Sequence, residues 1–155
     1  MDSATTLRLA DVPNIVGVKE ASSDPDQIAY VIKDSPEGFR VWSGNDNEIL
    51  STMAVGGYGI VSVAGNIISG QIQKMMGLLL EGDVEAAAAE HLRLLPIFNA
   101  LFYITNPIPI RYAMNRSGFS VGPARLPMVP EPSELAVFSA KFDPIMDQYA
   151  IDLAD

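Results

Sequence analysis

The sequence predicts an α/β protein that forms part of a TIM (β/α)8 barrel, namely the last three βα units followed by a C-terminal helical extension. Three apolar segments typical of strands recur at a spacing of twenty-odd residues, and the first two are each followed by a helical pattern. Strands that alternate with helices pair in parallel through right-handed crossovers. A complete barrel takes about 250 residues, so 155 residues account for only part of one.

Residues 1–68 are expected to form the barrel part. The segment Ser23-Asp24-Pro25 predicts a helix start, with an N-cap and a proline in the first turn, and this helix should end near Lys33. A second capping signal, Asn45-Asp46, predicts a helix over residues 47–55. The three predicted strands are Ile15–Lys19, Phe39–Ser43 and Gly59–Ala64.

Residues 69–155 are expected to form a closing barrel helix and a C-terminal helical region. Pro96 should kink or divide a long alanine-rich helix, and Asn106-Pro107-Ile108-Pro109 should start the next helix. The proline-rich stretch 121–132 should be an extended connector, and Ser133-Glu134 should cap the final helix. The predicted helices cover residues 70–80, 83–102, 107–116 and 133–153.

Lys19 is a lone ammonium that closes the apolar run 15–18. Such a run is typical of a strand buried on both faces in a parallel sheet, so we expect the Lys19 side chain to point into a core. Burying an unpaired ammonium is costly and favours the neutral amine, the nucleophile that forms a Schiff base with a ketone. This segment alone leaves open the alternative that the amine reaches solvent from a strand end. Glu20 alternates to the opposite side of the strand, where we expect it to be paired or capping.

The composition argues against several classes of partner and site. A net charge of −9 disfavours binding to nucleic acid or to an anionic membrane, since either needs a basic face. The chain has no cysteine and a single histidine, His91, so neither a thiolate metal site nor a multi-histidine zinc site is expected, and any carbonyl chemistry should be metal-free. The sequence shows no apolar stretch of membrane-spanning length and no signal peptide, which predicts a cytoplasmic protein.

Small and polar residues follow the predicted strands, at the edge where parallel α/β folds collect their reactive groups. Besides Lys19, these are the loops Ser43-Gly44-Asn45-Asp46 and Ala64-Gly65-Asn66. Glycine lets a small ligand approach the backbone, and N–H groups near helix starts suit a carboxylate, so a small keto acid is a candidate ligand. Gly-Asn-Asp is also an ordinary helix-capping turn, and the residues alone leave both interpretations open.

Four motifs resemble the dihydrodipicolinate synthase family, in the same order and at the same separations. The resemblance extends from about Thr6 to the proline-rich connector. The last motif favours the synthase branch of a wider class of lysine-dependent pyruvate aldolases, which includes N-acetylneuraminate lyase. The motifs are Gly17-Val18-Lys19-Glu20-Ala21, Ser43-Gly44-Asn45-Asp46, Gly56-Gly57-Tyr58-Gly59-Ile60-Val61-Ser62-Val63 and Asn106-Pro107-Ile108-Pro109.

The resemblance implies that Lys19 is the Schiff-base lysine that condenses with pyruvate. It also implies that the backbone carbonyl of Val61 lies beside the bound pyruvate, with Ser43 and Gly44 near the same pocket. In the family, the resulting enamine attacks aspartate semialdehyde and gives 4-hydroxy-tetrahydrodipicolinate, on the route to lysine. No cofactor is needed, because the protonated imine itself withdraws electrons.

Three features of the family are missing from this chain: a Thr-Thr-Gly-Glu motif, a proton-relay tyrosine on an earlier strand and a substrate-binding arginine. Thr5-Thr6 is followed by Leu7 and is therefore not that motif. A positioned acid–base group is worth about 10²–10⁴ in rate, so we expect the isolated chain to be a poor synthase.

Two classes of function remain open. In the first, the chain is part of a lyase that joins pyruvate to an aldehyde acceptor, either as a dihydrodipicolinate synthase or as an aldolase similar to N-acetylneuraminate lyase or to the keto-deoxy sugar acid aldolases. In the second, it is a non-catalytic half-barrel remnant. Three strands leave two open apolar edges, so both predict a homo-oligomer. In the first class, the missing strands come from another chain, such as a complementing N-terminal half-barrel, or from a longer parent of which this chain is a fragment; in the second, two half-barrels cover one another's exposed strands.

Overall fold

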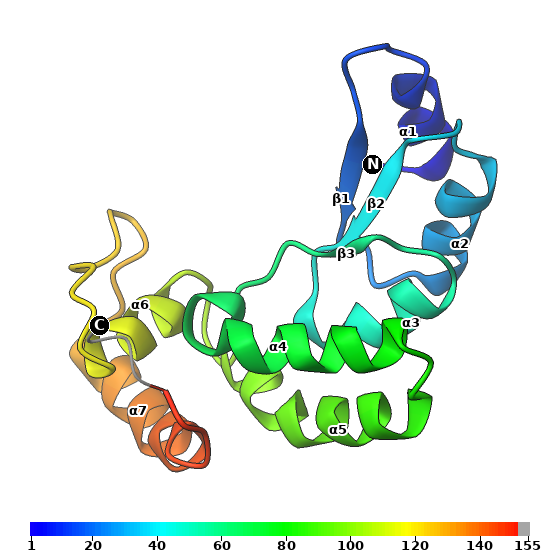
Figure 1. The fold of residues 1–155 in the computed structure, drawn as a ribbon. Coiled ribbons are helices and arrows are strands. Elements are labelled where there is room, and N and C mark those ends of the chain that lie inside the picture. Colours follow the sequence, from blue (N-terminus) through cyan, green and yellow to red (C-terminus); the bar gives the residue numbers. More distant parts are fainter. Residues whose placement is uncertain (152–155) are drawn as a thin grey trace. The chain divides into compact units, whose positions relative to one another are not determined.

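The computed structural model describes residues 1–151 and is an α/β fold (Figure 1). The chain divides into two compact units, the first being Met1–Ser62 and the second beginning at Val63. The first unit holds all three strands of the sheet. In chain order, its elements are α1 (Ser3–Ala10), β1 (Gly17–Glu20), α2 (Pro25–Asp34), β2 (Arg40–Ser43), the 3-10 helix η1 (Asp46–Glu48), α3 (Ile49–Ala54) and β3 (Gly59–Ile60).

The sheet is parallel, with the order β1-β2-β3, as the sequence predicts. Lys19 pairs with Trp42, and Glu20 pairs with Ser43. β3 is shorter than the predicted 59–64, because β2 leaves the sheet after Ser43. The Val61 amide still donates to the Ser43 carbonyl at 2.9 Å, and beyond that bond β2 offers no further strand residue.

Side-chain caps begin the first two helices. The Asp24 carboxylate accepts hydrogen bonds from the Asp26 and Gln27 amides, both at 3.1 Å, and starts α2 as predicted. Helix α1 was not predicted, although Asp2 caps it by accepting from the Thr5 amide at 2.8 Å. The core of this unit lies between the sheet and the helices, and its buried residues include Ile28, Val31, Val41 and Ile49.

The second unit is helical, with α4 (Gly65–Leu80), α5 (Val84–Ala100), α6 (Ile108–Arg116) and α7 (Pro132–Met146) (Figure 1). Its fully buried side chains include Leu94, Ile97, Phe98 and Phe142. The rings of Phe138 and Phe142 stack at 4.9 Å, and the edge of Tyr112 meets both. Helix α5 packs against α4 and α7, α6 contacts α4 directly, and the aromatic cluster joins α6 to α7.

Several predicted boundaries in the second unit are wrong. Helix α4 begins at Gly65 instead of residue 70, with a bend at Ile68. Pro96 lies inside α5 without dividing it. Proline has no N–H group to donate to the Leu92 carbonyl, but Leu92 and Pro96 are both exposed, so water can reach that carbonyl. The final helix begins at Pro132, after Glu131, without the predicted Ser133 cap. It ends at Met146, and the predicted end at residue 153 lies outside the described residues.

Candidate active site

Lys19 and Gly44 meet at the carboxyl ends of β1 and β2. The Gly44 amide donates to the Glu20 carbonyl at 2.6 Å, which continues the β1–β2 pairing past the last strand residue. A β-carbon at position 44 would lie 2.9 Å from Lys19 Cε and 2.5 Å from Ala21 Cβ. Glycine at this position therefore gives the Lys19 side chain its path along the end of the sheet.

The prediction that the Lys19 side chain is buried in a core is wrong for this structure, in which Lys19 is exposed. Its neighbour Glu20 and the β2 residues Val41 and Ser43 lie on the opposite face of the sheet and are buried. Helices α2 and α3 contact β2 and cover that opposite face. In the first unit, as the structure describes it, no second layer covers the face that carries Lys19.

The Ser43 side chain forms hydrogen bonds within the loop that follows β2. Its hydroxyl donates to the Asn45 carbonyl at 2.9 Å and accepts from the Asn45 amide at 3.1 Å. The residue is fully buried on the helix-covered side of the sheet. Its side chain therefore holds the Gly44 loop in shape, and any contact between Ser43 and a ligand on the Lys19 face would have to come from its backbone.

Val61 directly follows β3 and is 45% exposed. Its amide is tied to the Ser43 carbonyl, so the last residue of β2 connects the second and third strand ends. Together, Lys19, Gly44 and Val61 occupy the carboxyl ends of three consecutive parallel strands. The sequence placed Lys19 and the Gly44 loop at this edge, but it put Val61 inside a longer third strand and expected the loop 64–66 at the end of that strand; in the structure β3 ends at Ile60 and α4 begins at Gly65.

Asp46 is a buried carboxylate that the sequence placed both in the candidate ligand loop and in a helix-capping signal; in the structure η1 begins after Asn45 without a side-chain cap. It is 1% exposed and accepts a hydrogen bond from the hydroxyl of Ser62, which follows Val61. In the same loop, the Asn45 amide group donates to Glu48 Oε2 at 3.0 Å and to Ser23 Oγ at 3.1 Å. The loop after β2 is thus bonded to the segments that follow both neighbouring strands.

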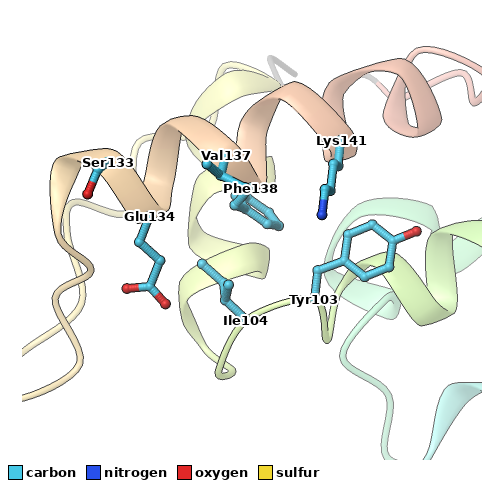
Figure 2. A pocket seen from close by; sticks show the side chains of 7 residues that line it. All are labelled: Tyr103, Ile104, Ser133, Glu134, Val137, Phe138 and Lys141. Atoms are coloured by element: carbon cyan, nitrogen blue, oxygen red, sulfur yellow. The ribbon is translucent and has the colours of Figure 1, made fainter.

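The second unit has a hollow of its own, which contains none of the predicted site residues. A hollow of about 620 Å³ lies between the α5–α6 connection and α7, and Figure 2 shows the Lys141 amine beside the Tyr103 ring at its edge. No group of three His, Asp or Glu side chains within residues 1–151 is placed to hold a metal ion. Over the same residues, no helix combines the length and apolar character needed to cross a membrane.

Comparisons with known proteins agree on one family. Residues 1–137 match the model of the family described as the dihydrodipicolinate synthetase family. The 4-hydroxy-tetrahydrodipicolinate synthase of Symbiobacterium thermophilum is 53% identical over 127 residues, which are 81% of this chain and 43% of that protein. The synthase of Dehalococcoides mccartyi strain 195 is 44% identical over 153 residues, which are 99% of this chain and 50% of the relative.

Solved structures of the same enzyme have a similar fold. The crystal structure of dihydrodipicolinate synthase from Aquifex aeolicus matches 99% of this chain with a TM-score of 0.89 and 32% identity, and 52% of that chain is covered. The synthase from Cyanidioschyzon merolae, solved with lysine bound, matches with a TM-score of 0.88 and 36% identity, over 95% of this chain and 49% of the other. The chain spans about half the length of the relatives that it matches.

Proposed function

Because the chain belongs to the dihydrodipicolinate synthetase family, we propose that it carries the Schiff-base part of a 4-hydroxy-tetrahydrodipicolinate synthase active site. The observation that carries this proposal is the contact between the Lys19 side chain and Gly44 at the carboxyl ends of adjacent parallel strands. An amine at that edge of an α/β sheet stands where such folds bind small substrates.

In the proposed reaction, Lys19 Nζ attacks C2 of pyruvate, and the carbinolamine loses water to give an imine. Loss of a proton from the pyruvate methyl group then gives an enamine, whose terminal carbon attacks the aldehyde carbon of aspartate semialdehyde. We assign the Val61 carbonyl and the Gly44 loop to the surroundings of the bound pyruvate. Gly44 follows β2, the neighbour of β1, and Val61 follows β3 on the other side of β2; the bonds of Ser43 and Asp46 restrain both segments.

The exposed face around Lys19 is the basis for a second proposal about partners. An enclosed amine is more readily neutral and nucleophilic, so full activity should require further βα units over this face. Relatives of about twice this length support that expectation. A complementing N-terminal half-barrel is one possible source of these units, and further copies of the chain are another. The isolated chain should then form the imine slowly and turn over poorly.

One observation favours a different candidate function. Because Lys19 is exposed, the chain alone also fits a non-catalytic half-barrel that at most binds a keto acid. Acceptors other than aspartate semialdehyde, as in the N-acetylneuraminate lyase-like or keto-deoxy sugar acid aldolases, are a further alternative. Turnover with each aldehyde in the presence of a family N-terminal half would separate these candidates.

Trapping the imine tests the proposal directly. The chain is incubated with pyruvate and borohydride, which reduces the imine to a stable secondary amine, and intact mass is compared with that of Lys19→Arg. We expect an adduct on the wild-type chain and its loss in the variant. An unmodified wild-type chain, under conditions that label a full-length synthase, would overturn the assignment of Lys19.

A further inference from the structure

Glu20 is a buried carboxylate that the proposed reaction does not use. It is 6% exposed and lies on the helix-covered side of the sheet, one residue after Lys19. Across residues 1–151, no cationic side chain forms an ion pair with it. Burying a carboxylate among neutral groups is costly unless hydrogen bonds compensate for its lost hydration. We therefore expect both of its oxygens to accept hydrogen bonds that stabilise the fold.

Those two oxygens join three consecutive pieces of the chain. Glu20 Oε1 accepts a hydrogen bond from the Ser22 amide at 2.7 Å, in the turn after β1. Glu20 Oε2 accepts from Gln27 Nε2 at 3.1 Å, in the first turn of α2. Ser22 Oγ accepts in turn from the amide of Asp24, the N-cap of α2, at 3.2 Å. The carboxylate thus holds the end of β1, the turn and the helix start in one arrangement.

The same turn determines where Lys19 can lie. Ala21, inside the turn, and Gly44 flank one another so closely that a β-carbon on Gly44 would meet both Ala21 Cβ and Lys19 Cε. The Glu20 carbonyl receives the Gly44 amide at 2.6 Å. A shift of the turn would therefore move Ala21 and, through the bond to the Glu20 carbonyl, Gly44, beside which the Lys19 side chain lies.

We infer that Glu20 is a positioning residue: from the far side of the sheet, its carboxylate clamps the β1–α2 turn and so holds Lys19 against Gly44. This inference rests on the proposed Schiff-base function of Lys19. Hydrogen bonding carries the effect, so an amide of the same shape should replace the carboxylate. In Glu20→Gln, the new side chain can still accept from Ser22, and its amide group can donate to Gln27 once the Gln27 amide is turned over, which gives up only the exposed bond from Gln27 Nε2 to the Met1 carbonyl.

The test compares three variants by the rate of borohydride-trapped adduct formation per folded molecule. Glu20→Ala, which loses both bonds, should slow trapping about tenfold, because small displacements of a reacting group are costly. Glu20→Gln should stay within about threefold of the wild type, because it can keep both bonds. Val31→Ala is the matched control, since it removes fully buried methyl groups from α2 without touching the turn, and it should leave the rate unchanged.

A second measurement decides the inference even if the wild-type chain forms no adduct and the proposed function fails. NMR relaxation of the Lys19 Cε methylene should show greater mobility in Glu20→Ala than in the wild type, Glu20→Gln or Val31→Ala. Equal mobility in all four proteins would overturn the positioning role. Where the adduct does form, unchanged trapping in Glu20→Ala, or equal slowing in Val31→Ala, would also overturn it.

Discussion

Replacing Gly44 with alanine places a methyl group where the structure has no space for it. The new carbon would lie 2.5 Å from Ala21 Cβ, 2.9 Å from Lys19 Cε and 3.2 Å from the Glu20 carbonyl oxygen. The end of the Lys19 side chain can swing away, but Ala21 Cβ is attached directly to the turn and can move only with it. Overpacking of this kind costs about 1–3 kcal/mol, so we expect the free energy of unfolding to fall by about 2 kcal/mol.

The same substitution should also displace the Lys19 side chain and slow imine trapping with pyruvate. Urea unfolding, followed by the fluorescence of Trp42 in β2, reports the first unit, and borohydride trapping reports the amine. The matched control is Gly77→Ala in α4, where an added β-carbon has no neighbour within 4 Å. Alanine there should leave the Trp42 transition and the trapping rate unchanged, and should raise the stability of the second unit, followed by the circular dichroism of its helices, by about 0.5–1 kcal/mol, since glycine is a poor helix residue. A Gly44→Ala protein with wild-type stability and trapping rate would refute the packing argument.

Two further predictions concern the second unit. Hydrogen bonds from Arg93 lower the pKa of Glu90 below its ordinary value; the contribution of Glu90 to stability should therefore be present near pH 7 and be lost as the pH falls through that lowered pKa. Urea unfolding at neutral and acid pH should show a smaller acid loss for Glu90→Gln, and an identical loss would contradict this. Tyr149→Phe removes the bond from the buried tyrosine hydroxyl to the Arg93 carbonyl, 2.7 Å long, and should cost about 1 kcal/mol in calorimetric unfolding; no change would show that this bond contributes nothing.

Local signals in the sequence were sufficient for the order and direction of the main elements. Proline after Asp24 predicted the start of α2, and the spacing of apolar segments predicted three parallel strands. Strand alternation also placed Glu20 opposite Lys19, where it is buried and caps the following turn. These features depend on residues close together in the chain, which is why pattern and capping chemistry predict them.

Features that depend on distant parts of the chain were not predictable in the same way. The apolar run before Lys19 indicates a strand buried on both faces, yet burial also requires a second layer over the sheet, and the first unit supplies only the helix-covered side. The length of β3 is set by where β2 ends, and the Glu20–Gln27 bond joins residues on different elements. The Asp2 cap of α1 was readable from the sequence and was missed.

The position of the pyruvate adduct is the most direct test of the central claim, that Lys19 is the Schiff-base lysine. The chain has three other lysines, Lys33, Lys74 and Lys141, all exposed like Lys19, and they serve as internal controls for nonspecific reaction. After borohydride reduction, peptide mass spectrometry should find the adduct concentrated on Lys19. An adduct spread evenly over the four lysines, or absent from Lys19, would contradict the claim.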